Sequence, residues 1–354
     1  MNIMKSQILT SLLAILLSIT TVRAQSIEGT PYCLPMNGAQ FTIKVEKTQY
    51  TPGRFCLYSM RYLKQNVELE PSTTYRIIGI DIDATARPDT SRHFKLIVDK
   101  KHSINQVTCS PDGQLLAINT DAAPIKATIR QFVPAQKPAT PNPTDFMTED
   151  ILNATSTTKM AELTAKEIYD IRDSRNQLSK GEADFMPKDG TQLKLMLANL
   201  NRQETALRQL FEGVVTKDTT WTTVNYMPMK EGNSVLFRFS TRRGLVDYDD
   251  LGGEPYYITV TNLHTAPAPA PVPAGQKEDK ADIGLRISKP SRIKLTLQHN
   301  TDIVATFEMN AAQFGIVESL SGDLFGKKQS TALLLDPMTG SIKEIRQITP
   351  QVPK

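Results

Sequence analysis

The 354-residue sequence lacks the short motifs that identify several large enzyme families. It contains no Gly-x-Ser-x-Gly, no His-Glu-x-x-His, no glycine-rich phosphate loop and no Cys-x-x-Cys. Its four histidines, at positions 93, 102, 264 and 299, do not stand at metal-ligand spacing from one another. These absences favour a protein without catalytic activity. Glycosidases that use paired carboxylates carry no sequence signature, so that class stays open.

Concentrated charge of one sign is also missing. The formal net charge is +4, and no run of five or more like charges occurs. Nucleic-acid-binding surfaces normally carry a concentrated basic patch. We therefore expect no nucleic-acid partner.

No apolar run reaches the roughly 20 residues that span a bilayer. The apolar stretch over residues 8–19 follows Lys5 and precedes Val22-Arg23-Ala24, which is the arrangement of a cleaved signal peptide over residues 1–24. We therefore expect export to the periplasm or cell surface and no transmembrane segment in the mature chain, which would begin at Gln25.

Cysteine is scarce, with Cys33, Cys56 and Cys109 as the three examples. An exported chain meets an oxidising compartment, where thiols can pair. Cys33 and Cys56 could close a short loop and leave Cys109 over; three unpaired, partly buried thiols are the alternative. A catalytic cysteine is disfavoured, because no histidine lies near any of the three in sequence.

The clearest helical pattern lies within residues 145–212. A first run ends at Gly181, a residue type typical of the position after a helix, and a second run begins after Asp189, a helix-capping residue type. The second run has an apolar stripe at three-to-four spacing: Leu193, Met196, Leu197, Leu200, Leu207, Leu210 and Phe211. Two such amphipathic helices bury their stripes best against each other or across a sheet, which predicts a helical hairpin.

The turn of this hairpin is acidic. Asp189 is predicted to cap the second helix, and Glu182 and Asp184 are predicted to pair with Arg172 or Arg175, one or two turns back on the first helix. We interpret these five residues as structural and not as a ligand site.

Strand patterns fill the rest of the chain. Residues 25–133 form a predicted β-rich N-terminal domain, with strands at 41–45, 75–82 and 94–98, a short helix after Pro52-Gly53, and a hairpin around residues 110–113. A proline-rich linker at 134–144 precedes the helices. A β region at 213–265 follows them, then a proline-rich loop or spacer at 266–276 and a C-terminal β region at 277–354. We therefore predict an α+β fold in which β-rich N- and C-terminal regions flank a central helical hairpin.

A second acidic cluster lies at residues 247–254, where glycines accompany the carboxylates. Calcium favours such oxygen-rich loops, although the EF-hand pattern is not met here, because Leu251 and Ile258 stand where oxygen ligands should be. An acidic hairpin turn is the alternative, and no other cofactor is expected. The candidate calcium ligands are Asp247, Asp249, Asp250 and Glu254. The candidate ligand-binding aromatic residues near this loop are Trp221, Tyr256 and Tyr257.

Residues 171–213, IRDSRNQLSKGEADFMPKDGTQLKLMLANLNRQETALRQLFEG, resemble the central block of a family of exported proteins from anaerobic, gut- and mouth-dwelling Gram-negative bacteria that carry a domain of unknown function. Further matches are VEKTQYTPGRF, RFSTRRGLVDYDDLGGEPYYITV, QFGIV and LDPMTGSIKEI, collinear over nearly the whole mature chain. One departure is GLRISKPSRI, which lacks the aromatic residue expected before Arg286. The resemblance implies export and a shared fold, and it carries no activity.

We therefore expect an exported, non-enzymatic envelope protein with a structural or protein-binding role and with other envelope proteins as partners. The alternative is a glycan- or calcium-binding module that uses the residues named above. A second alternative is a hydrolase built on carboxylates such as Glu182, Asp184 or Glu254.

Overall fold

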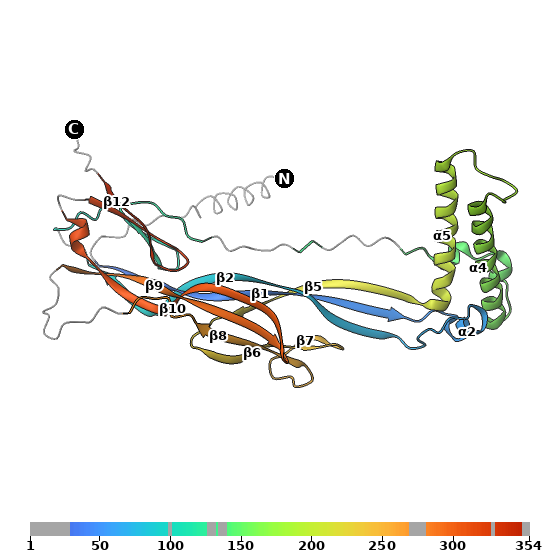
Figure 1. The fold of residues 1–354 in the computed structure, drawn as a ribbon, viewed down its shortest axis with the longest axis horizontal. Coiled ribbons are helices and arrows are strands. Elements are labelled where there is room, and N and C mark those ends of the chain that lie inside the picture. Colours follow the sequence, from blue (N-terminus) through green and yellow to red (C-terminus); the bar gives the residue numbers. More distant parts are fainter. Residues whose placement is uncertain are drawn as a thin grey trace, which may run out of the picture.

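Two very long strands form the axis of the molecule. In the computed structural model, which describes residues 29–97, 101–125, 132–133, 140–268, 281–326 and 330–348, β1 (Thr30–Thr51) pairs antiparallel with β2 (Ser72–Leu96) along nearly its whole length. On its other edge β1 pairs with β5 (Val214–Tyr226), which completes a three-stranded sheet. The sheet runs along the rod-shaped body in Figure 1. The predicted signal peptide lies outside the described residues.

These strands are longer than the sequence predicts. Pro35 of β1 and Pro88 of β2 look like strand ends in the sequence, because proline has no N–H to donate to a ladder. In the structure the two prolines face each other, beside a register shift between Cys33 and Pro35. The antiparallel pairing continues on both sides of the two prolines, so neither of them ends its strand.

A second sheet packs face to face on the first. It contains β6 (Gly232–Ser240), β7 (Gly244–Val246), β8 (Glu254–Asn262), β9 (Asp282–His299) and β10 (Asp302–Ser321), in the order β10-β9-β8-β6-β7. The core between the sheets contains Phe41, Ile43 and Val45 of β1, which alternate with polar residues as the sequence predicts, and Ile258 and Leu295 of the second sheet.

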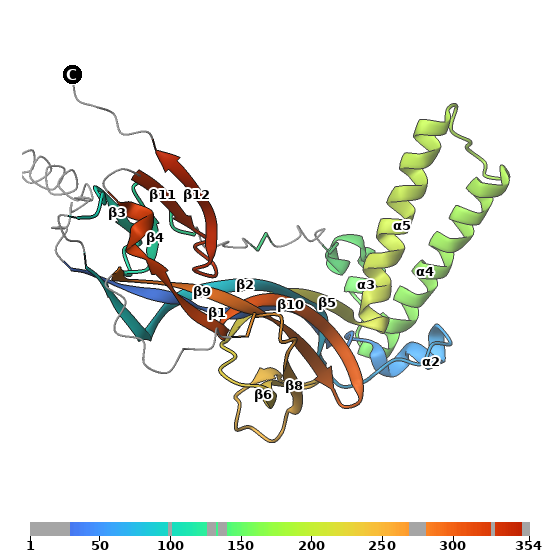
Figure 2. The same ribbon diagram turned by 60° about the vertical axis from the view of Figure 1, so that its left-hand side comes forward.

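A four-stranded sheet lies at one end of the rod (Figures 1 and 2). It joins β3 (Val107–Cys109) and β4 (Leu115–Ile118) to β11 (Ser330–Leu335) and β12 (Ile342–Ile348). The short helix η3 (Gly322–Phe325) precedes β11 in the chain. The predicted turn between β3 and β4 is confirmed, because Gly113 N donates to Ser110 O over 3.0 Å. Strands from opposite ends of the sequence therefore share one sheet, and the chain is β-rich.

The helices lie at the other end of the rod. The short elements η1 (Cys56–Tyr58), α2 (Ser59–Tyr62), η2 (Pro143–Phe146) and α3 (Glu149–Leu152) surround the base of a hairpin formed by α4 (Thr157–Lys180) and α5 (Gly190–Glu212). Phe55, Ile168, Leu207 and Phe211 are buried at this base. Above it the hairpin extends away from the sheets (Figure 2).

The predicted ends of these helices are confirmed. Asp189 accepts a hydrogen bond from Gln192 N over 2.7 Å, which satisfies one of the free N–H groups at the start of α5. Gly181 follows α4 with a φ of 77°, a left-handed conformation that glycine adopts without steric cost. The short helix predicted after Pro52-Gly53 is present as η1 and α2.

The predicted pairing of Arg172 and Arg175 with Glu182 or Asp184 is wrong. Arg172 Nε and Arg175 Nη1 each lie 2.6 Å from a carboxylate oxygen of Glu204, which is buried on the facing helix α5. Glu182 and Asp184 follow Gly181, where the chain has left the helix, and both are exposed. Glu182 and Asp184 are closer to the two arginines in sequence. Glu204 is closer to them in space, because it lies at the same level of the hairpin on the facing helix.

Of the two alternatives for the cysteines, the structure agrees with three unpaired thiols and not with a bond between Cys33 and Cys56, because all three thiols are free. Cys33 lies near the start of β1, and Cys56 lies beyond its end. At about 3.3 Å per residue, the strand between them is roughly 60 Å long. A disulfide needs Cα atoms within about 7 Å. Cys33 and Cys109 lie on opposite sides of the chain at residues 114–115. Cys33 pairs with Gln114 on one edge, and Cys109 pairs with Leu115 on the other.

The second proline-rich segment connects β8 to β9, which are neighbours in one sheet. Its residues 269–276, like residues 134–139 of the first segment, lie outside the described residues. Within the part of the chain that is described, no helix combines the length and apolar character needed to span a bilayer.

Leu207→Ala tests the base of the hairpin. Leu207 is fully buried, so we expect the free energy of unfolding to fall by about 2–5 kcal/mol, as for other large-to-small core changes. Leu195→Ala on the same helix is the matched control, because Leu195 is 63% exposed and should change stability by less than about 0.5 kcal/mol. Urea unfolding followed by circular dichroism measures both, and equal losses would contradict the assigned burial.

Thiol titration tests the cysteine geometry. In denaturant the purified protein should react with Ellman's reagent at all three cysteines. In the native state Cys109 should react slowly, because burial raises the pKa of its thiol to about 11 and the thiolate is the reactive form. A denatured count of one thiol would show that a pair had formed.

The ion pairs of Glu204 should make stability depend on pH. Burial acts to raise the pKa of Glu204, but hydrogen bonding and attraction from Arg172, Arg175 and Arg208 outweigh it and hold that pKa below its usual value. A lowered pKa stabilises the fold above the pKa of the unfolded chain, about 4.3, and this stabilisation is lost as the pH falls through the lowered value.

We therefore expect Glu204→Gln to lower the free energy of unfolding at pH 7 by about 1.5–3 kcal/mol. The difference in unfolding free energy between the variant and the parent should disappear in acid, where Glu204 of the parent becomes protonated. Glu162→Gln removes an exposed pair with Lys159 and serves as the control. A gap that stays constant down to pH 3 would contradict the charge-based explanation.

Candidate functional site

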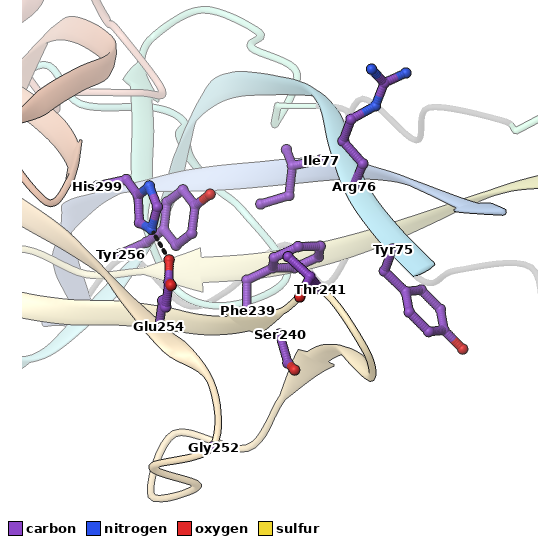
Figure 3. A pocket seen from close by; sticks show the side chains of 10 residues that line it. All are labelled: Tyr75, Arg76, Ile77, Phe239, Ser240, Thr241, Gly252, Glu254, Tyr256 and His299. Carbon is purple, nitrogen blue, oxygen red and sulfur yellow. Dashed lines mark hydrogen bonds and ion pairs between the residues drawn. The ribbon is translucent and has the colours of Figure 1, made fainter. Parts of the chain in front are cut away.

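An open pocket lies at the edge of the two-sheet body, where the starts of β2 and β8 meet the ends of β6 and β9 (Figure 3). Its volume is about 310 Å³, at the lower end of the range for small-ligand sites. The side chains that shape it include Tyr75, Ile77, Phe239, Glu254, Tyr256 and His299.

A stack of three rings across neighbouring strands builds one wall. Phe237 of β6 lies opposite Tyr256 of β8, and Tyr256 lies opposite His299 of β9. The ring centroids are 4.5 Å apart for Phe237 and Tyr256 and 4.4 Å apart for Tyr256 and His299, and both pairs are nearly parallel. Burial, with a smaller effect of Glu254, raises the pKa of Tyr256.

Glu254 completes this wall, two residues before Tyr256 on the same face of β8. One carboxylate oxygen lies 2.7 Å from His299 Nε2. The carboxylate is therefore fixed in position by a ring that is itself fixed by stacking. Because the Glu254 side chain remains 69% exposed, it can also meet a ligand from solvent.

The three predicted ligand-binding aromatic residues are not brought together. Trp221 of β5 lies opposite Lys44, and its ring contacts the Lys44 ammonium at 4.1 Å. Lys44 alternates with the buried Ile43 and Val45, so Trp221 lies on the outer face of the three-stranded sheet. Tyr256 packs against the core from the other sheet, and Tyr257 points away from that core.

The predicted calcium ligands are divided between separate partners. Asp250 forms an ion pair with Arg243 over 2.8 Å, and Gly252 N donates to the same carboxylate. Glu254 is bound to His299, and Asp247 and Asp249 are exposed. Across the described residues, no three His, Cys, Asp or Glu side chains gather as a metal site. Calcium binding stays a prediction.

The carboxylates considered for hydrolysis lie in two places. Glu254 belongs to the pocket, whereas Glu182 and Asp184 lie at the tip of the hairpin, beyond about 35 Å of helix α5. Paired-carboxylate hydrolysis needs two groups about 5–10 Å apart. Glu254 therefore does not form such a pair with either of the others.

Sequence reasoning missed most of the pocket. It assigned no role to His299, Phe237 or Tyr75. Alternation along each strand could have placed Glu254 and Tyr256 on one face, and likewise Leu297 and His299. No signal in the sequence indicates that β6, β8 and β9 lie side by side at this register, because their pairing joins residues far apart in the chain.

The distal half of the hairpin is the second surface of interest. Leu193, Met196, Leu197 and Leu200 belong to the apolar stripe of α5 and are only half-buried, whereas Leu207 and Phe211 further along the same stripe are fully buried. Near the base, η2, α3 and α2 also pack on the two helices. Further out, α4 and α5 cover only one side of each other, so the stripe is only partly covered there. The exposed apolar side chains near the tip are Phe185, Met186 and Leu195.

Comparisons with known proteins identify the family. Residues 28–343 match the family described as domain of unknown function DUF4831, and the chain belongs to it. The match covers both the pocket and the hairpin, as the resemblance of residues 171–213 implies. Comparisons with curated proteins and with solved structures give no match to this chain.

Proposed function

We propose that this protein is an exported, non-enzymatic component of a bacterial cell envelope that binds another protein through the distal half of its helical hairpin. The signal-peptide pattern of residues 1–24 supports export to the periplasm or cell surface. The missing catalytic motifs support a binding or structural role.

The proposal rests on the apolar stripe of α5, which is only half-buried in the distal half of the hairpin. A helix normally buries such a stripe against the core, and on α5 the burial is complete only at the base. Leu193, Met196 and Leu197 keep part of their apolar surface in water, on a hairpin that extends away from the sheets. Exposed apolar surface of this kind is typical of protein interaction sites.

The occupant that fits best is an amphipathic helix of a partner protein. A groove between two antiparallel helices accepts a third helix, whose apolar side chains would cover the stripe at three-to-four spacing. Phe185 in the turn before α5, which is 63% exposed, would then lie at the border of the contact. Leu195 lies on the opposite face of α5 from the stripe and would stay outside it.

Site-specific crosslinking in envelope fractions of the native host tests the proposal. A photoreactive residue at position 185 should give one reproducible crosslinked protein, because the tip would border the bound helix. The same residue at position 345 is the control, since Ile345 is exposed on β12 at the other end of the rod. Equal yields from the two positions would contradict hairpin-specific binding.

A second variant separates binding from folding. With the photoreactive residue kept at position 185, Leu193→Ser combined with Leu197→Ser should remove the crosslink, because both side chains belong to the stripe that the partner helix would cover. Circular dichroism should still show a folded hairpin, because its buried base is unchanged. An unchanged crosslink in this variant would also contradict the proposal.

A further inference from the structure

The charge inside the pocket comes from one carboxylate. Arg76 lines the pocket with its backbone, while its side chain points away and binds Glu46 over 3.1 Å (Figure 3). Among the side chains that face the pocket, Glu254 is the carboxylate, and no lysine or arginine side chain faces the pocket with it. An anionic ligand would therefore be repelled.

Glu254 is prepared to accept a further donor. Its Oε2 lies 2.7 Å from His299 Nε2, and its Oε1 has no hydrogen-bond partner within the described part of the chain. His299 is held in turn by its stack on Tyr256. The bond to His299 therefore restricts the motion of the Glu254 carboxylate, which reduces the entropy lost when a ligand binds.

The walls favour an aliphatic body over a sugar ring. Ile77 and Phe239 belong to the apolar core and supply the far wall. A sugar normally requires the open face of an aromatic ring, but both faces of Tyr256 are covered, one by Phe237 and the other by His299. What remains is the apolar surface of Ile77 and Phe239 in the same pocket as the Glu254 carboxylate.

We propose that this pocket binds a primary ammonium group on an aliphatic stem, with the ammonium at Glu254 and the stem against Ile77 and Phe239. The shared chemistry has two sources, a lysine side chain of another protein and a free alkyl diamine. An ammonium donates charge-assisted hydrogen bonds to a carboxylate, and these are stronger than bonds between neutral groups. The proposal is independent of hairpin docking.

Binding of small probes to the full mature protein tests it. The probes are Nα-acetyl-lysine methylamide, cadaverine and the neutral isostere Nα-acetyl-norleucine methylamide, titrated up to tens of millimolar. Amide resonances of Gly252, Tyr256 and His299 should shift with the two amines and stay in place with the norleucine derivative. Tighter binding of the lysine derivative would indicate a protein side chain as the source, and tighter binding of cadaverine would indicate a free amine.

Two variants locate the interaction. Glu254→Gln should weaken binding of both amines by about tenfold. Asp249→Asn removes an exposed carboxylate of the same loop that does not line the pocket, and it should leave the affinity unchanged. Equal binding of the norleucine derivative, unchanged affinity in Glu254→Gln, or no shift with either amine would overturn the proposal.

Discussion

A single strand connects all three hydrophobic cores of this protein. Near its start, β1 contributes Tyr32 to the core under the four-stranded sheet, and its middle contributes Phe41 and Ile43 to the core between the two larger sheets. Just beyond its end, Phe55 is buried at the base of the hairpin. Because β2 and β5 pair with its two edges, β1 holds together the sheet from which the helices extend.

Local signals in the sequence predicted much of this architecture. The capping role of Asp189, the left-handed Gly181 and the turn at residues 110–113 each depend on a few neighbouring residues, so their chemistry is readable without a fold. The alternation of Phe41, Ile43 and Val45 likewise marks the buried face of a strand. The lengths of β1 and β2 were not predictable, because facing prolines become tolerable only when the partner strand is known.

The errors share one physical cause, which is that proximity in sequence was used in place of proximity in space. Arg172 and Arg175 had acidic neighbours in the turn, but the facing helix offered the buried Glu204. Trp221 was predicted to lie with Tyr256 near the loop at residues 247–254. Strand alternation instead places Trp221 on the outer face of the three-stranded sheet. Likewise, the ring stack of the pocket exists only because β6, β8 and β9 pair in one particular register.

The same strand register brings the pocket close to the base of the hairpin. Tyr75 of the pocket lies opposite Lys47 of β1, and Thr51, four residues later, lies opposite Val214, which follows α5. Four residues of strand span about 13 Å. The distal half of the hairpin lies further away, beyond its buried base and along α5. The pocket and the base of the hairpin come from distant parts of the sequence, but β1 holds them close together.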